Sequence, residues 1–268
     1  MEIDLNSYLN NSIDRFRIKK IGYLPKPCMP FITLEDDLVF YGMPGKKEKI
    51  LDDIFTGIVT TIKDLEFRYF QYNRKVKQHS KYYYKPGDVV VELGSYLGYY
   101  SMYVAKQVGP TGKVISVEMI PENFAVLKLN LATNYAENTI AINRGVHKEK
   151  GVRTAYLGCN QIAGFREDVI TRFVPNFDEI SVEMDTVDNI LHENGVSVVD
   201  LMIIQVNGNE IDVLQGMSKS IQSVRNFAIA APYDRKGMDH KKIISDYLIK
   251  NGFDVEVVSP WVFARCRN

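Results

Sequence analysis

The sequence predicts an α/β fold in which helices cover both faces of a mostly parallel sheet. From Lys85 onward, short apolar runs alternate with segments of helical spacing, which is typical of parallel strands joined by helices. The chain then closes on "FDVEVVSPWVFARC" (253–266), which divides into two strands around a short Ser-Pro turn. Because so short a connection cannot hold a parallel crossover, these last two strands are expected to be antiparallel.

The alternation can be followed element by element. The expected strands are "GDVVVEL" (87–93), "KVISVEM" (113–119), "NTIAINRGV" (138–146), "DLMIIQV" (200–206) and "FAIAAPY" (227–233). The expected helices are "YYSMYVAKQVG" (99–109), "PENFAVLKLNLATN" (121–134), "EIDVLQGMSKSI" (210–221) and "KKIISDYLIKNG" (241–252). Gly109 with Pro110 ends the first helix, and Pro121 suits the first turn of the second.

Residues 1–80 read as an N-terminal extension of a domain that spans 81–268. Residues 1–46 are irregular apart from "FITLEDDLVFYGM" (31–43), which predicts a small hairpin. Apolar residues recur at spacings of three and four between Ile50 and Leu65, so residues 47–80 are expected to be helical. This helix packs on the main domain, either as a lid over a ligand or as part of a homo-oligomer interface.

Composition limits the class of protein. The 33 basic and 33 acidic residues give a formal net charge of +0, which argues against binding nucleic acid through overall charge. Cys28, Cys159 and Cys266 are widely separated and show no metal-binding spacing. The sequence shows neither the apolar core of a signal peptide nor a run long enough to span a membrane, so a cytoplasmic protein is expected.

Two glycines and an acid mark a candidate ligand site. Gly94 and Gly98 fall between the first strand and its helix, where ligands bind in open parallel sheets. Their G-x-x-x-G spacing matches neither the dinucleotide fingerprint nor the phosphate loop, and a simple tight turn is the alternative. Glu118, at the end of the next strand, can accept hydrogen bonds from both hydroxyls of a ribose. S-adenosylmethionine has such a ribose and an anionic end, and it lacks a pyrophosphate.

The residues that carry a family resemblance are the segments 85–134, "INRGVHKEKG" (142–151), "SVEMDTVDNIL" (181–191) and "VDLMIIQVNGNEIDVLQGM" (199–217). Together they resemble the FkbM-type methyltransferases, which have the Rossmann-like class I S-adenosylmethionine-dependent fold. The resemblance implies a seven-stranded, mostly parallel sheet with an antiparallel C-terminal strand. It also implies O-methylation of a hydroxyl on a sugar or small metabolite.

The same resemblance implies which residues bind the cofactor. Those expected around its methionine moiety are Glu92, Gly94, Ser95, Tyr96, Gly98, Tyr99 and Tyr100, and Gln205 is also expected to bind the cofactor. Glu118 is expected at the ribose, and Met119, Arg144, Gly145 and Val146 are expected at the adenine.

Two positions depart from the family pattern. The family usually reads D-V-E-G after the fourth strand, whereas this chain reads "QVNG", with Gln205 and Asn207 in place of the acids. Amides are poor ligands for a hard cation without carboxylates, so no catalytic metal is expected. The end of the fifth strand also differs, which moves the expected substrate wall to Tyr233, Asp234, Arg235 and His240; Asn207 is also expected to bind substrate.

An alcohol acceptor must lose a proton, and histidine is the usual base near neutral pH. Among His79, His147, His192 and His240, the last follows the fifth strand and is the candidate catalytic base, and His147, which follows the third strand, is the alternative. A non-catalytic S-adenosylmethionine-binding protein and an RNA methyltransferase are the alternatives. Asp185 and Asp188 are interpreted as residues at a helix N-terminus without a chemical role.

Overall fold

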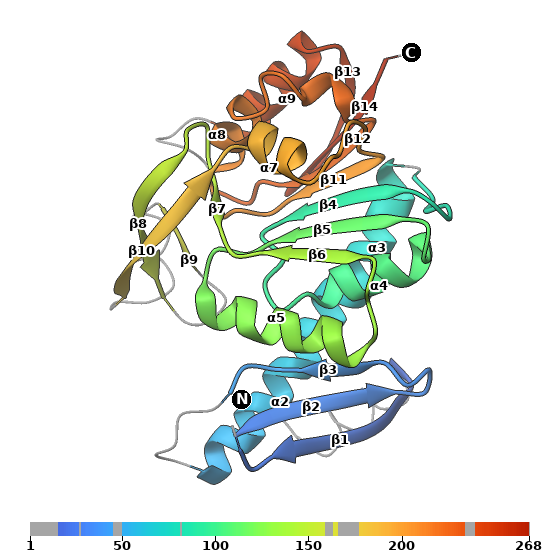
Figure 1. Ribbon diagram of the computed structural model, residues 1–268, viewed down its shortest axis with the longest axis vertical. Helices are drawn as coiled ribbons and strands as arrows, with labels where there is room; N and C mark the ends of the chain where they lie inside the picture. Colours follow the sequence, from blue (N-terminus) through green and yellow to red (C-terminus); the bar gives the residue numbers. More distant parts are fainter. Residues whose placement is uncertain are drawn as a thin grey trace.

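The computed structural model describes residues 16–26, 28–44, 50–80, 82–158, 163–165, 177–233 and 239–267. Its central element is a seven-stranded sheet with the order β13-β14-β12-β11-β4-β5-β6 (Figure 1). The strands are β4 (Val89–Leu93), β5 (Lys113–Val117), β6 (Thr139–Ile142), β11 (Leu201–Ile204), β12 (Asn226–Ala230), β13 (Phe253–Val258) and β14 (Trp261–Cys266). β14 pairs antiparallel with both β12 and β13, while the other pairs are parallel. The predicted fold class and the antiparallel last strand are confirmed.

Helices bury both faces of this sheet. The helices of the main domain are α4 (Tyr99–Val108), α5 (Pro121–Thr133), α7 (Val187–Glu193), α8 (Glu210–Gln215), α9 (His240–Lys250) and the short 3₁₀ turn η3 (Ile221–Ser223). Alternate residues of each strand point to opposite faces. Val91 and Leu93 therefore pack in the cluster of α7, α8 and α9, whereas Val90 packs in the cluster of α4. Burial on both faces explains why these strands read as unbroken apolar runs.

A smaller four-stranded sheet, β7-β10-β8-β9, stands beside the carboxyl ends of β4, β5 and β6 (Figure 1). It consists of β7 (Gly145–Val146), β8 (Gly151–Leu157), β9 (Ala163–Gly164) and β10 (Asp178–Asp185). The sequence did not predict this sheet, because the first four residues of β8 are all exposed and give no apolar signal. The strand expected at 138–146 accordingly ends at Ile142, and Gly145–Val146 pair with β10 instead.

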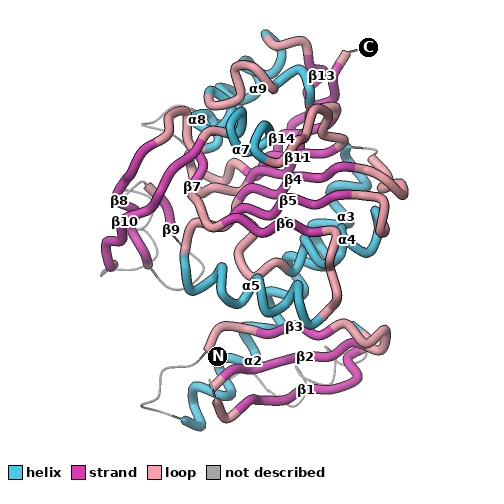
Figure 2. The backbone as a smooth tube through the Cα atoms, viewed as in Figure 1, coloured by secondary structure: helices cyan, strands magenta, loops and turns pink. Residues whose placement is uncertain are grey.

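The N-terminal extension forms a three-stranded antiparallel sheet followed by a long helical segment (Figure 2). The strands are β1 (Ile18–Leu24), β2 (Met29–Leu34) and β3 (Val39–Tyr41), so the predicted hairpin is present and β1 adds a strand that was not predicted. The helical segment consists of α2 (Ile50–Asp64), the π-helical η1 (Leu65–Gln71), α3 (Tyr72–Lys75) and the π-helical η2 (Val76–Ser80). This agrees with the helix expected over 47–80.

Hydrophobic packing joins the extension to the main domain. Phe40, Ile62 and Leu65 of the extension share one buried cluster with Tyr99 and Leu127 of the main domain. The rings of Phe40 and Tyr99 meet edge to face, with 5.2 Å between their centroids. Within the described ranges, no helix is both long enough and apolar enough to cross a membrane.

Candidate active site

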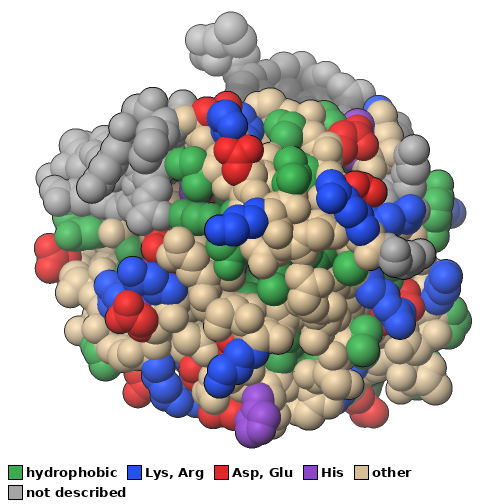
Figure 3. Space-filling view, turned by 90° about the horizontal axis from the view of Figure 1, so that it is seen from above, with side chains coloured by type: hydrophobic (Ala, Val, Ile, Leu, Met, Phe, Trp, Pro, Cys, Tyr) green, Lys and Arg blue, Asp and Glu red, His purple; other side chains and the backbone are tan. Residues whose placement is uncertain are grey.

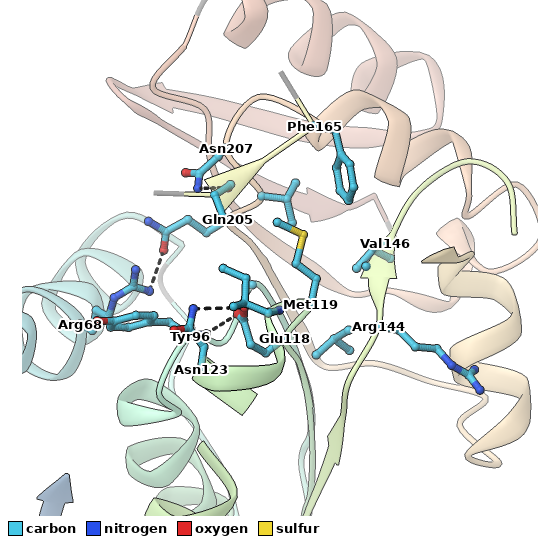
Figure 4. A pocket seen from close by; sticks show the side chains of 16 residues that line it. Arg68, Tyr96, Glu118, Met119, Asn123, Arg144, Val146, Phe165, Gln205 and Asn207 are labelled. Atoms are coloured by element: carbon cyan, nitrogen blue, oxygen red, sulfur yellow. Dashed lines mark hydrogen bonds between the residues drawn. The ribbon is translucent and has the colours of Figure 1, made fainter. Parts of the chain in front are cut away.

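A cavity lies at the carboxyl ends of β4, β5 and β11 (Figure 4). Nine of the residues named from the sequence line it: Gly94, Tyr96, Glu118, Met119, Arg144, Gly145, Val146, Gln205 and Asn207. They come from four separate segments of the chain. The two sheets together therefore bring the predicted ligand residues to one place.

Gly94 lets the loop after β4 pass directly against the end of β11. Its φ is +86°, and a Cβ added there would lie 2.0 Å from the carbonyl oxygen of Gln205. The amides of Gly94 and Ser95 both donate to the carbonyl of Val117, at 2.9 and 3.0 Å. A side chain larger than hydrogen would push the loop away from both neighbouring strands.

Glu118 is the acid of the cavity, and the glycine loop itself holds it in place. Its side chain is buried, and its Oε2 accepts a hydrogen bond from the amide of Tyr96 at 2.8 Å. Its Oε1 accepts hydrogen bonds from the amide of Ile120 at 3.0 Å and from Nδ2 of Asn123 at 3.4 Å. Since each oxygen of an ionised carboxylate can accept two hydrogen bonds, Oε2 keeps the capacity to accept a ligand hydroxyl. Burial raises the pKa of Glu118, and the bonds from Ile120 and Tyr96 oppose that rise.

At the opposite end of the cavity, Arg144 contributes the stem of its side chain rather than its charge. Its Nη1 lies 2.6 Å from Asp185 Oδ2 and 3.0 Å from Glu193 Oε2, so the guanidinium points away from the cavity (Figure 4). Asp185 is fully buried at the end of β10, one residue before the helix cap Thr186. Asp185 was predicted to lie at a helix N-terminus without a chemical role, and in the structure it also holds the guanidinium of Arg144.

The two amides that replace the family acids each make a specific contact. Asn207 has a φ of +52°, and its Nδ2 donates to the carbonyl of Ala163 at 2.8 Å. A carboxylate cannot donate this hydrogen bond, so the amide ties β9 to the turn after β11. Gln205 Oε1 accepts from Nη1 of Arg68 at 3.5 Å.

Five residues expected around the methionine moiety lie behind the loop and do not line this cavity: Glu92, Ser95, Gly98, Tyr99 and Tyr100. Glu92 accepts a short hydrogen bond from Ser101, and Tyr99 donates to the carbonyl of Tyr41 at 2.9 Å. Tyr100 pairs its hydroxyl with that of Tyr84. The assignment of these five residues to the cofactor stays a prediction. Tyr99 and Tyr100 begin α4, and the start of a helix directs part of its surface into the core.

The candidate base His240 also lies elsewhere. Its side chain is fully buried at the start of α9, with Nδ1 3.1 Å from the carbonyl of Tyr233 and 3.4 Å from Glu210 Oε2. All four histidines are within the described residues, and none lines the cavity. The role of His240 as the catalytic base therefore stays a prediction. Tyr233 does not line the cavity either, while Asp234, Arg235 and Cys159 lie outside the described residues.

The cavity also contains residues that sequence reasoning missed, chiefly Arg68, Asn123 and Phe165. Asn123 could have been found, since it lies in the first turn after the strand that ends near Glu118. Arg68 carries no local signal, because it lies in η1, far from the glycine loop in sequence. Among the described residues, no group of three or more His, Cys, Asp or Glu side chains is arranged to hold a metal ion.

Comparison with known proteins agrees with this fold. The family described as "Methyltransferase FkbM domain" matches residues 88–255. The AMB antimetabolite synthetase AmbE of Pseudomonas aeruginosa is 25% identical over 208 residues, which are 64% of this chain and 10% of that protein. Protein-L-isoaspartate O-methyltransferase 1 of Archaeoglobus fulgidus is 30% identical over 99 residues, which are 37% of this chain and 42% of that protein.

Among solved structures, the methyltransferase FkbM of Methylobacillus flagellatus is similar in fold, with 12% identity and a TM-score of 0.46. That similarity covers 82% of this chain and 67% of the other. The chain thus spans less than half the length of both curated relatives, whereas the family match covers more than half of the chain itself. The protein belongs to the FkbM methyltransferase family.

Proposed function

We propose that this protein transfers a methyl group from S-adenosylmethionine to a hydroxyl of a sugar or small metabolite, without a catalytic metal. The observation that carries the proposal is the hydrogen bond of 2.8 Å between the amide of Tyr96 and Glu118. It joins the glycine loop to the buried carboxylate, so a ribose bound at Glu118 would also lie against that loop. The family membership and the absence of a pyrophosphate-type glycine motif support the same cofactor.

The residues present fit this cofactor. Gly94 lets the loop pass closely against the end of β11, and Glu118 is a preorganised acceptor for a ribose hydroxyl. Met119, Val146 and the stem of Arg144 form the far wall, where they would contact the adenine (Figure 4). The bound cofactor would supply a methyl group that is already strongly electrophilic.

The chain's own contribution is positioning and exclusion of water. Phe165 and Ala163 lie with Asn207 on the side of the small sheet, and this is where we place the acceptor. Correct alignment of two reactants in a site closed to water accounts for a large part of many enzymatic accelerations. No step depends on His240, which is held by contacts outside the cavity.

The first test is calorimetric titration with S-adenosylmethionine and with NADH. We expect micromolar binding of the former and none of the latter. Glu118→Gln should weaken binding of S-adenosylmethionine about 10- to 100-fold, because a hydrogen bond to a charged group is lost. Glu122→Gln, an exposed acid in the first turn of α5, is the matched control and should leave affinity unchanged.

Purified protein that is free of carried-over ligand and binds no S-adenosylmethionine would contradict the proposal. If binding is found, transfer of a radiolabelled methyl group is measured with sugar and metabolite alcohols, in the presence and absence of EDTA. Because we propose transfer without a catalytic metal, we expect EDTA to leave the rate of methyl transfer unchanged. Transfer that EDTA abolishes and Mg²⁺ restores would refute that part of the proposal.

A further inference from the structure

The N-terminal extension places one cation in the cavity. Arg68 comes from the π-helical η1, and its guanidinium lies over the ring of Tyr96, with its carbon 4.4 Å from the ring centroid. Its Nη1 lies 3.5 Å from Gln205 Oε1. Arg68 therefore meets the glycine loop and the end of β11 at the same point. π-Helical turns occur frequently at functional sites.

The extension also positions Tyr96, the residue on which Arg68 stacks. Tyr96 donates from its hydroxyl to Asp64 Oδ2 at 3.1 Å, and Asp64 is the last residue of α2. Asp64 and Arg68, four positions apart in one helical segment, thus hold the hydroxyl and the face of the same ring. Tyr96 has a φ of +52°, and its amide is the donor to Glu118. The extension is therefore built into the loop that would hold the cofactor.

The two ends of the cavity differ in charge. Glu118 and Met119 lie in the middle, and Arg144 turns its charge outward to Asp185 at one end (Figure 4). Arg68 lies at the other end, beside Tyr96 and Gln205 (Figure 4). A ligand with its ribose at Glu118 and its base beside Arg144 would extend its remaining end toward Arg68.

We infer that Arg68 binds the carboxylate at the amino-acid end of the cofactor, so that the N-terminal extension is part of the cofactor site. This inference rests on the proposed function. A guanidinium presents paired N–H donors that match the two oxygens of a carboxylate. Gln205 is neutral, so it adds no negative charge beside a bound carboxylate. The charge of Arg68 also holds down the pKa of Asp64, Glu92 and Glu118 against the effect of burial.

Two ligands that differ only at the amino-acid end separate this role from a structural one. S-adenosylhomocysteine carries the carboxylate, and 5′-methylthioadenosine has the same adenine and ribose without it. Arg68→Gln should weaken S-adenosylhomocysteine about 10- to 100-fold and change 5′-methylthioadenosine by less than about twofold. Arg68→Lys keeps the charge but not the paired donors, and its affinity should fall between that of the wild type and that of Arg68→Gln.

Two controls make the result decisive. Arg74→Gln changes an exposed arginine of the same helical segment and should leave both affinities unaltered. Glu118→Gln should weaken both ligands, because both carry the ribose. Circular dichroism and thermal unfolding of each variant confirm that it is folded before its affinity is compared.

The outcomes distinguish the inference from the proposed function. If Arg68→Gln weakens both ligands equally or neither, while Glu118→Gln weakens both, Arg68 has only a structural role and the cofactor assignment stands. If the wild type binds neither ligand, the proposed function fails and this inference fails with it.

Discussion

Gly94 shows how one residue makes the cavity possible. Two separate features require glycine here. The backbone of Gly94 is left-handed, and a Cβ added to it would lie 2.0 Å from the carbonyl oxygen of Gln205. The glycine therefore allows β4 and β11 to approach at the point where the ligand loop begins. Gly195 shares only the first property, with a φ of +62° and nothing within 4 Å of an added Cβ.

We predict that Gly94→Ala destabilises the fold by about 3 kcal/mol or more and abolishes binding of S-adenosylmethionine. The left-handed conformation alone costs about 1–2 kcal/mol, and the backbone clash adds strain. Gly195→Ala should show only the cost of the left-handed conformation and should bind S-adenosylmethionine as the wild type does. Urea denaturation and calorimetry measure both effects. Equal destabilisation by the two substitutions would show that the contact with Gln205 is unimportant.

At the scale of elements, a pair of asparagines attaches the extension to α5. Asn134 Oδ1 accepts from the amide of Val39 at 2.8 Å, and its Nδ2 donates to the carbonyl of Val39 at 2.7 Å. Asn130 makes the same pair of bonds with Tyr41, at 2.7 and 3.1 Å. Four residues rise about 6 Å along a helix, and two residues rise about 6.7 Å along a strand, so the spacings match. The two carboxamides therefore pair with the backbone of the edge strand β3 as a neighbouring strand would.

We predict that Asn134→Ala lowers the free energy of unfolding by about 1–3 kcal/mol, since it leaves backbone groups of β3 without their partner. Limited proteolysis should then cut within residues 16–44 faster than in the wild type. Asn194→Ala is the control, because its side chain donates within its own helix segment, to Ile190 at 2.8 Å. Unchanged proteolysis of the Asn134 variant would show that hydrophobic packing alone holds the extension.

At the scale of the whole molecule, buried acids beneath the cavity link stability to pH. Burial raises the pKa of Glu92 to about 7, against the opposing effects of the Ser101 hydrogen bond and the Arg68 charge. Burial likewise raises the pKa of Asp64 to about 6, although Arg68 and Tyr96 oppose it. A carboxyl group with a raised pKa is easier to protonate in the folded state than in the unfolded state. Its contribution to stability is therefore present at low pH and is lost as pH rises.

We predict that the stability of Glu92→Gln, compared with that of the wild type at the same pH, is higher at pH 8 than at pH 5. For Glu92 the folded state holds the extra proton between about pH 4.5 and about pH 7, so the wild type loses stability across that window. The variant should lose less, by about 2 kcal/mol. Urea denaturation of both proteins at several pH values tests this, with exposed Glu122→Gln as control. Parallel pH profiles for wild type and Glu92→Gln would show that Glu92 titrates normally.

The face of the molecule drawn in Figure 3 carries charges of both signs. Figure 3 shows Lys and Arg interspersed with Asp and Glu on the visible face, without one continuous basic area. This agrees with the balanced composition of 33 basic and 33 acidic residues. Because this face shows no continuous basic area, we keep the proposal of a small acceptor in preference to RNA.

The sequence by itself determined the main sheet, its antiparallel last strand and the core of the ligand loop. These features depend on local patterns, namely apolar runs, turn residues and the placing of Gly94 and Glu118 at strand ends. Gly94 and Glu118 followed from strand ends, which share one edge of a parallel sheet, and the family resemblance named the other cavity residues that were expected.

Only the tertiary structure decided which side chains line the cavity. Tyr99 and Tyr100 follow the loop directly, yet helix geometry buries them, while Arg68 arrives from a distant helix. His240 follows the expected strand, yet α9 directs it into the core beside Glu210. The small sheet was missed, since the first four residues of β8 are exposed, although Ile180, Val182 and Met184 of β10 alternate as strand residues do. Strand order follows from periodicity along the chain, whereas the direction of a side chain depends on packing between segments that are far apart in sequence.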